Sequence, residues 1–167
     1  MTQSAMRSEV GTQAPARDTA GVIARPPLVY LVSILAGFAL ELAWPTSLFS
    51  GSLTTPLGGS LIALAVLLFL LAAREMQKAR TPIPAYRPTT AIVPTGPYRY
   101  SRNPIYLSFT LLHLGLGIWA DSVWLLAVMI PTLVLMTYGV IAREERYLER
   151  RFGKVYLQYK TAVRRWL

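Results

Sequence analysis

Four apolar runs, each close to the length of a membrane-spanning helix, constrain this chain more than any other feature. The runs are Leu28–Trp44, Leu57–Ala73, Pro104–Ala120 and Ser122–Ala142. A helix needs about 20 mainly apolar residues to cross the hydrocarbon core of a bilayer, and flanking aromatic and Arg side chains extend the shorter runs. Asp121 and its neighbours alone separate the last two runs, which indicates a tight helical hairpin. We therefore predict an all-α integral membrane fold with about four transmembrane helices.

The distribution of charge predicts how these helices are oriented. Pro45–Pro56 carries no charge, and the connection between the last two runs carries only Asp121. Lys and Arg gather instead between the second and third runs and after the fourth run. By the positive-inside rule, both termini and the central loop are cytoplasmic. We expect a bacterial inner membrane protein with its functional face toward the cytosol. The net charge of +9 is explained by this topology and by attraction to anionic headgroups, so no nucleic-acid partner is expected.

The length of 167 residues predicts one domain. Residues 1–25 are polar and read as a flexible N-terminal tail without the pattern of a signal peptide. Residues 26–167 form the transmembrane domain. The chain has no Cys, which excludes disulfides, a thiolate nucleophile and Cys-bound metal. We predict no metal site, and the sequence does not indicate an oligomeric state.

The first polar segment attached to an apolar run is Gly96–Tyr106, with the sequence GPYRYSRNPIY. It concentrates planar hydrogen-bond donors and aromatic rings at the start of the third run. Pro104 suits the first turn of a helix, and Asn103 can cap that helix. A helix start also offers free N–H groups and a positive dipole end. The alternative interpretation is an ordinary interfacial anchor of Arg and Tyr.

The second polar segment follows the fourth run and begins with the adjacent acids Glu144 and Glu145. Acidic residues at the edge of a membrane span are candidates for function, although local salt bridges would also explain them. Beyond them, apolar side chains recur at spacings of three and four and predict an amphipathic helix along the membrane interface. Gly153 is expected to break or cap this helix. The apolar positions are Leu148, Phe152, Val155, Tyr159, Val163 and Trp166.

Together these segments resemble the isoprenylcysteine carboxyl methyltransferase and phospholipid methyltransferase superfamily of small membrane enzymes. The family pattern is Gly-Pro-Tyr-x-x-x-Arg-His-Pro-x-Tyr-x-Gly, then Glu-Glu, then Phe-Gly-x-x-Tyr-x-x-Tyr. The matching residues are Gly96, Pro97, Tyr98, Arg102, Pro104, Tyr106, Glu144, Glu145, Phe152, Gly153, Tyr156 and Tyr159. The match covers roughly Thr95–Trp166. Two positions depart from it: Asn103 replaces the family His, so it cannot act as a base, and Ser108 replaces a Gly.

The resemblance implies methyl transfer from S-adenosylmethionine to a lipophilic or membrane-associated acceptor, which is a carboxylate, an amine or a thiol. It also implies that Glu144 and Glu145 bind the amino or ribose hydroxyl groups of the cofactor. Arg102 would pair with the methionyl carboxylate or with an acidic acceptor. The predicted catalytic residues are Arg102, Asn103 and Tyr106. The predicted cofactor-binding residues are Tyr98, Arg102, Asn103, Pro104, Tyr106, Glu144 and Glu145.

Other polar residues within the runs have structural and functional interpretations. His113 is either an acceptor contact or a histidine bonded to a neighbouring helix, and a pairing between His113 and Glu41 stays open. Arg74 and Glu75 are expected to close the second span at the interface, and Pro131 is expected to kink the fourth.

Two other functions remain open. One is a nicotinamide-dependent reductase of the sterol-reductase type, against which the paired Glu and the short chain argue. The other is a non-catalytic membrane protein with a degenerate site, which Asn103 favours.

Overall fold

The structure of the chain is a computed structural model that describes residues 21–48, 52–82 and 89–167. Most of the predicted flexible tail, as well as Arg87, lies outside the described residues. The described part of the chain is helical and contains no strand, which confirms the predicted all-α class. Its elements are α1 (Pro26–Ala43), α2 (Thr54–Lys78), the 3-10 turn η1 (Gly96–Arg99), α3 (Pro104–Trp119), α4 (Val123–Leu135), the π-helical η2 (Met136–Ile141), α5 (Ala142–Phe152) and α6 (Lys154–Ala162).

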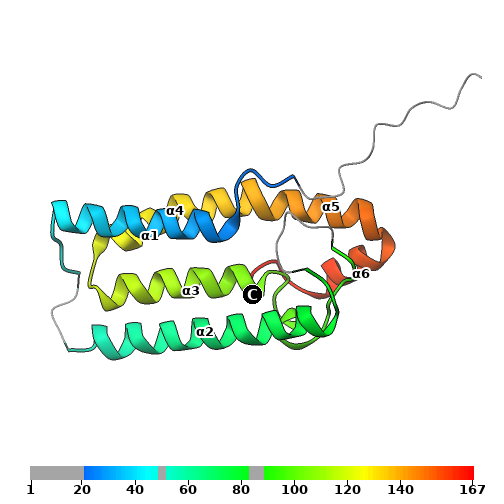
Figure 1. Cartoon of the computed structure of the whole chain (residues 1–167), viewed down its shortest axis with the longest axis horizontal. Helices are drawn as coiled ribbons and strands as arrows, with labels where there is room; N and C mark the ends of the chain where they lie inside the picture. Colours follow the sequence, from blue (N-terminus) through cyan, green and yellow to red (C-terminus); the bar gives the residue numbers. More distant parts are fainter. Residues whose placement is uncertain (1–20, 49–51, 83–88) are drawn as a thin grey trace, which may run out of the picture.

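Each predicted apolar run corresponds to one helix of a bundle (Figure 1). Three helices are long and apolar enough to cross a membrane, namely Pro26–Ala43, Thr54–Lys78 and the continuous helix Val123–Phe152. The fourth, α3, is shorter at 16 residues. Arg74 and Glu75 lie inside the last turns of α2, which runs on to Lys78.

The long helix that comprises α4, η2 and α5 extends beyond the membrane. At 1.5 Å per residue its 30 residues measure about 45 Å, whereas the hydrocarbon core is about 30 Å thick. Its apolar part ends near Ala142, and seven of the eleven residues of α5 are Glu or Arg. We therefore treat α5 as lying outside the membrane-spanning segment. Pro131 lies inside α4, and the wider π turns begin further along, at Met136.

The bundle is held together by close approaches at small residues. α3 lies between α2 on one side and the pair α1 and α4 on the other (Figure 1). Gly58 of α2 and Gly115 of α3 face each other, because a Cβ at Gly115 would come within 3.1 Å of the Gly58 carbonyl oxygen. Gly37 of α1 similarly lies against Leu125 of α4. Small residues let helix backbones approach closely, which is a common way to pack helices in a membrane.

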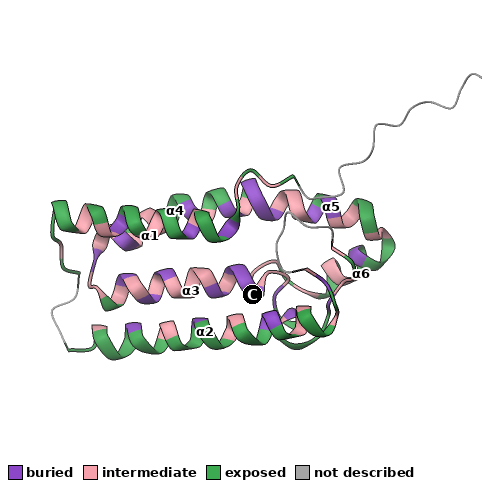
Figure 2. Cartoon of the chain, viewed as in Figure 1, coloured by how far each residue is buried: buried purple, intermediate pink, exposed green. Residues whose placement is uncertain are grey.

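The outer faces of the helices carry exposed apolar side chains, whereas the buried residues face the inside of the bundle (Figure 2). Leu31 and Leu35 of α1 and Leu64 and Leu67 of α2 are each half or more exposed. Such continuous apolar faces suit contact with lipid rather than water.

The two ends of the bundle differ. At one end α2 ends, α3 begins, and α5 and α6 lie nearby; we call this the charged end (Figure 1). The other is the opposite end. Toward the opposite end, Glu41 accepts hydrogen bonds from the Thr46 backbone and hydroxyl and from the Ser122 hydroxyl. His113 Nε2 bonds to the Leu125 carbonyl at 3.0 Å. Glu41 and His113 therefore have other partners and do not pair with each other.

The C-terminal part folds back at Gly153, as expected, because this residue has a positive φ of 53°. Within the predicted apolar stripe, Val155 is 61% exposed, whereas its neighbour Tyr156 is 2% exposed. The break at Gly153 restarts the helical register, so the spacing of α5 does not carry over to α6.

Candidate functional site

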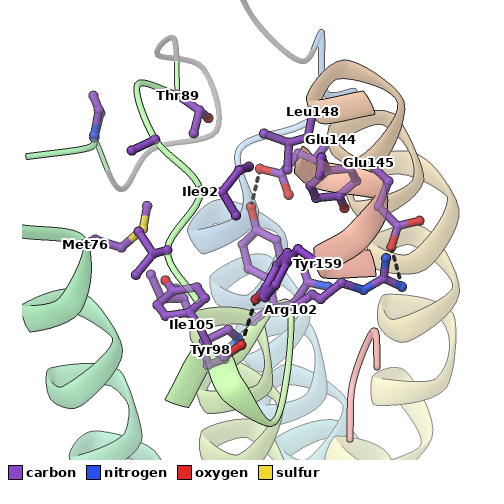
Figure 3. A pocket seen from close by; sticks show the side chains of 17 residues that line it. Met76, Thr89, Ile92, Tyr98, Arg102, Ile105, Glu144, Glu145, Leu148 and Tyr159 are labelled. Atoms are coloured by element: carbon purple, nitrogen blue, oxygen red, sulfur yellow. Dashed lines mark hydrogen bonds and ion pairs between the residues drawn. The ribbon is translucent and has the colours of Figure 1, made fainter. Parts of the chain in front are cut away.

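A cavity at the charged end brings the two polar segments of the sequence together (Figure 3). It encloses about 120 Å³, which is roughly ten times the space that one water molecule needs. Every residue predicted for the site lines this cavity: Tyr98, Arg102, Asn103, Pro104, Tyr106, Glu144 and Glu145. Folding therefore places side chains about forty positions apart in the sequence around one space.

The loop before α3 is held in place by a tight turn at Gly96. This residue has a φ of +58°, and a Cβ would come within 2.7 Å of the Glu75 side chain. Glu75 in turn accepts a hydrogen bond from Thr95 Oγ1 at 2.6 Å. The turn positions Tyr98, which is 8% exposed and whose carbonyl accepts from the Tyr159 hydroxyl at 2.8 Å. The end of α2 thus orients the loop that forms one wall of the cavity.

Asn103 precedes α3 but does not cap it with its side chain, so this prediction is wrong. Its Nδ2 donates instead to the carbonyl oxygen of Arg165 at 2.9 Å. The C-terminal segment brings a backbone carbonyl next to Asn103, and this carbonyl accepts the hydrogen bond from the side-chain amide. The side chain is therefore not turned toward the N–H groups of the helix, as a cap would be. Asn103 therefore joins the start of α3 to the segment after α6.

Glu144 lies on the first turn of α5 and contacts α3. It accepts a hydrogen bond from the Tyr106 hydroxyl through Oε1 at 2.9 Å (Figure 3). Burial raises the pKa of Glu144 to about 7, the Tyr106 bond lowers it, and the charge of Glu145 raises it. No described residue donates to the second oxygen, Oε2, so this carboxyl keeps an acceptor for a ligand.

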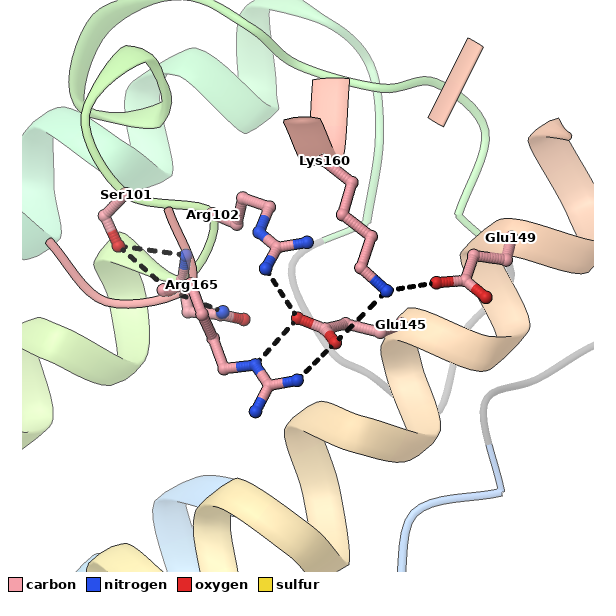
Figure 4. Close-up of polar contacts among 7 residues, drawn as sticks. Ser101, Arg102, Glu145, Glu149, Lys160 and Arg165 are labelled. Atoms are coloured by element: carbon pink, nitrogen blue, oxygen red, sulfur yellow. Dashed lines mark hydrogen bonds and ion pairs between the residues drawn. The ribbon is translucent and has the colours of Figure 1, made fainter. Parts of the chain in front are cut away.

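Glu145, by contrast, is already fully engaged. Arg165 donates from Nε to Oε1 at 2.9 Å and from Nη2 to Oε2 at 2.7 Å, and Arg102 Nη2 lies 3.2 Å from Oε1 (Figure 4). Lys160 Nζ lies 4.0 Å from Oε2 and 2.5 Å from Glu149. Glu145 thus ties α5 to the start of α3 and to the C-terminal segment.

Sequence reasoning missed Arg165 and Lys160 as parts of this site. In the sequence both stand among the basic residues that set the topology, since neither belongs to a motif and Arg165 is preceded by another Arg. Only the fold-back at Gly153 brings them to Glu145.

Arg102 is the residue with unused hydrogen-bonding capacity. Its side chain is 9% exposed, and Nη2 contacts Glu145. Neither Nε nor Nη1 makes a hydrogen bond to any described residue. Buried polar groups in folded proteins almost always have partners. Nε and Nη1 point to different sides of the guanidinium, so each of them needs an acceptor oxygen of its own. The side chain also brings a positive charge to the wall of the cavity.

Tyrosine rings cover much of the remaining wall. Burial is the main cause that raises the pKa of Tyr156 to about 12, and it also raises the pKa values of Tyr98 and Tyr159. These phenols stay neutral near pH 7 and supply hydrogen bonds and ring faces rather than charge. The rings of Tyr156 and Tyr159 lie 6.2 Å apart. A cation bound beside them would face the electron-rich side of an aromatic ring.

Comparison with known proteins identifies the class to which this fold and site correspond. The family model for phospholipid methyltransferases matches residues 53–155, from the start of α2 to the start of α6. The chain belongs to this family of membrane methyltransferases. Comparison with solved structures found no match.

Three relatives show similarity over shorter stretches. An uncharacterized protein of Haemophilus influenzae is 47% identical over 64 residues, which are 38% of this chain and all of that protein. The nickel-cobalt-cadmium resistance protein NccN of Alcaligenes xylosoxydans xylosoxydans and the cobalt-zinc-cadmium resistance protein CzcN of Cupriavidus metallidurans are each 36% identical over 66 residues. These residues are 40% of this chain and 31% of each of the two resistance proteins, so the match spans about a third of their length.

Proposed function

We propose that this chain transfers a methyl group from S-adenosylmethionine to a lipophilic or membrane-associated acceptor. Membership of the family supports methyl transfer in general. The observation that carries the cofactor assignment is the cavity that brings the cation Arg102 together with Glu144, whose Oε2 accepts no hydrogen bond from the described residues. When bound, S-adenosylmethionine would supply an electrophilic methyl carbon on a sulfonium: the acceptor would bond to this carbon as the C–S bond breaks in line, and the neutral thioether would leave.

In this proposal the residues of the cavity bind and orient. Arg102 pairs with the methionyl carboxylate by its charge, in a charge-assisted contact. Glu144 accepts from the amino group or from a ribose hydroxyl through its free Oε2. Tyr98, Tyr106 and Tyr159 surround the ligand with rings that suit a sulfonium.

Asn103 and Pro104 shape the wall at the start of α3. The amide nitrogen of Asn103 is engaged by Arg165, whereas its Oδ1 accepts no hydrogen bond from the described residues and is left for the ligand. Because a side-chain amide neither takes up nor releases a proton near neutral pH, Asn103 acts by positioning. Positioning contributes much to the rate of an in-line displacement, since the reacting atoms must be close and aligned.

The proposed location follows from the charge pattern of the sequence. The cavity lies at the charged end, next to the basic residues of α5 and α6. The positive-inside rule would put this end on the cytosolic side of a bacterial inner membrane, where S-adenosylmethionine is available. The exposed apolar helix faces would allow a lipophilic acceptor to reach the site from the bilayer.

The names of NccN and CzcN refer to metal resistance. Among the residues that the structure describes, no group of three or more His, Asp or Glu side chains is placed to hold a metal ion. No observation in the described part of the chain favours metal binding as a second function.

The test begins with titration of the detergent-purified protein with S-adenosylmethionine and, separately, with NADPH. We expect saturable binding of the first alone. Binding of NADPH alone would favour the reductase, and binding of neither would favour a non-catalytic protein. Incubation with a total lipid and metabolite extract and S-adenosylmethionine labelled on the methyl group would then identify the acceptor, whether amine, carboxylate or thiol.

A further inference from the structure

A groove on the surface of the bundle lies between α1 and α4, apart from the cavity at the charged end. It is lined by residues between Ala24, just before α1, and Ala36, and by residues of α4 between Val128 and Leu135. None of its lining residues lines that cavity. The groove takes in about 440 Å³, and ligand pockets in proteins measure roughly 300–1,000 Å³. It is therefore large enough to hold a ligand of its own.

The bottom and the edges of the groove differ in burial. Thr132 is 5% exposed and Ser33 is partly buried, whereas Leu28, Val32 and Leu135 are each 40% or more exposed. Small side chains thus lie at the bottom, and larger apolar side chains stand at the edges. The groove exists because α1 and α4 meet here through a serine and a threonine, which do not fill the space between the edges.

The two hydroxyls at the bottom are already used within the protein. Thr132 Oγ1 donates to the Val128 carbonyl at 2.7 Å, and Ser33 Oγ lies 2.6 Å from Thr132 Oγ1, to which it donates. No hydroxyl hydrogen is left for a polar ligand. The other lining side chains are Ala, Val, Leu and Pro. The groove therefore suits a hydrocarbon chain.

The length and position of the groove match one leaflet of a bilayer. Leu28 and Ala36 are eight residues apart on α1, which is about 12 Å along the helix, and Ala24 extends the groove beyond the start of α1. The hydrocarbon of one leaflet is about 15 Å thick, half of the core. Since α1 begins at the charged end, the groove follows the hydrocarbon of that leaflet from its polar surface toward the middle of the bilayer.

Positive charge lies at the polar end of the groove. Arg25 is exposed and directly follows the lining residue Ala24. Arg143 Nη1 donates to the Gly21 carbonyl at 3.1 Å, which places this side chain beside the segment that leads into α1. A lipid whose chain lies in the groove would have its headgroup at this end. Guanidinium groups there favour a headgroup with a phosphate and a net negative charge.

We infer that this groove binds an acyl chain of an anionic phospholipid from the leaflet at the charged end, with the phosphate held near Arg25 and Arg143. The bound lipid would join α1 to α4 along the half of the bundle that carries the cavity. This site is separate from the cavity and does not depend on the proposed function.

The test uses native mass spectrometry of the full chain released from nanodiscs. The nanodiscs contain equal amounts of phosphatidylglycerol, which is anionic, and phosphatidylcholine, which has no net charge, with the same acyl chains. Retained lipids are identified by their mass. We expect one retained lipid per chain, with phosphatidylglycerol favoured about fivefold or more, which corresponds to the attraction of at least one Arg near the membrane surface.

Two pairs of variants locate the site. Ala36→Phe should abolish the retention, because a phenyl ring takes up space that the acyl chain would occupy. Ala63→Phe is the matched control, since Ala63 is equally exposed in class but lies on α2, outside the groove. It should retain the lipid as the wild-type protein does. If thermal unfolding shows that Ala36→Phe is not folded, Val32→Trp carries the test.

The headgroup is tested separately. The double variant Arg25→Gln with Arg143→Gln should still retain a lipid, but its preference for phosphatidylglycerol should fall close to one. Arg150→Gln is the control, because Arg150 is exposed and lies about two turns beyond Arg143 on α5. It should keep the wild-type preference.

Three results would overturn this inference. Equal retention by folded Ala36→Phe and Ala63→Phe would show that the lipid binds elsewhere. A wild-type protein that retains no lipid, or retains both lipids equally, would exclude an anionic phospholipid site. A dimer that Ala36→Phe dissociates would show that a second copy of the chain covers the groove.

Discussion

The hydroxyl of Tyr106 donates a hydrogen bond to Oε1 of Glu144 at 2.9 Å and so joins the first turn of α3 to the first turn of α5. This contact connects the two sequence segments that line the cavity. It also affects the ionisation of Glu144, because a donor to a carboxylate stabilises its charged form.

Replacing Tyr106 with Phe should therefore raise the pKa of Glu144 above its value of about 7, since burial would act without the opposing hydrogen bond. The carboxyl resonance of Glu144, identified by its absence in Glu144→Gln, can be followed by NMR as a function of pH. Tyr100→Phe is the control, because Tyr100 is 69% exposed. An unchanged titration in Tyr106→Phe would show that this hydroxyl does not act on the carboxyl.

The raised pKa of Glu144 also predicts how stability depends on pH. The folded protein holds the Glu144 proton more tightly than the unfolded chain, whose carboxyl has a pKa of about 4.5. The free energy of unfolding should therefore fall as the pH rises from about 4.5 to about 7, in the ligand-free protein. Thermal unfolding in detergent would show a smaller decrease over this window in Glu144→Gln. Parallel curves for the two proteins would contradict the prediction.

Glu145 and Glu149 lie on the same helix and differ in burial, so they form a matched pair for stability. Glu145→Gln leaves the buried Arg102 without its charged partner, which should lower the free energy of unfolding by about 3 kcal/mol. Glu149→Gln removes a partly exposed pair with Lys160 and should cost about 1 kcal/mol or less. Denaturant or thermal unfolding of both variants checks the difference. Similar losses of unfolding free energy in both variants would mean that Glu145 does not hold α5 to the start of α3 and the C-terminal segment.

The packing of α2 against α3 predicts opposite effects on stability when each of two neighbouring glycines is replaced by Ala. A Cβ at Gly58 would lie 2.6 Å from the backbone nitrogen of Trp119, so Gly58→Ala should cost about 1–3 kcal/mol. Gly59 has nothing within 4 Å of such a Cβ, and Gly59→Ala should be neutral or stabilise the helix by up to about 1 kcal/mol. The unfolding temperatures of the two variants in detergent test this difference. A destabilised Gly59→Ala would argue against this placement of the helices.

The sequence predicted the helices well because their signal is local. Each long apolar run is close to a span, and the charges that interrupt the runs mark where the spans end. The meeting of Arg102 with Glu144 and Glu145 could also be predicted, since an even number of helices lies between the start of the third run and the end of the fourth. Two antiparallel spans return the chain to the end at which they began.

The contacts that sequence reasoning missed depend on the fold-back of the chain at Gly153. The helical register changes at this residue, so Tyr156 rather than Val155 is buried. The same fold-back brings the Arg165 carbonyl to Asn103 and the Arg165 side chain to Glu145. Local capping rules do not include a backbone acceptor that arrives from more than sixty positions away.

The bond between the Arg102 N–H and the Arg164 carbonyl has a practical consequence. This amide proton is protected from exchange with solvent only while the segment after α6 is docked on the loop before α3. Deuterium uptake at one backbone position would thus report how often the wall of the cavity opens, without any label or ligand.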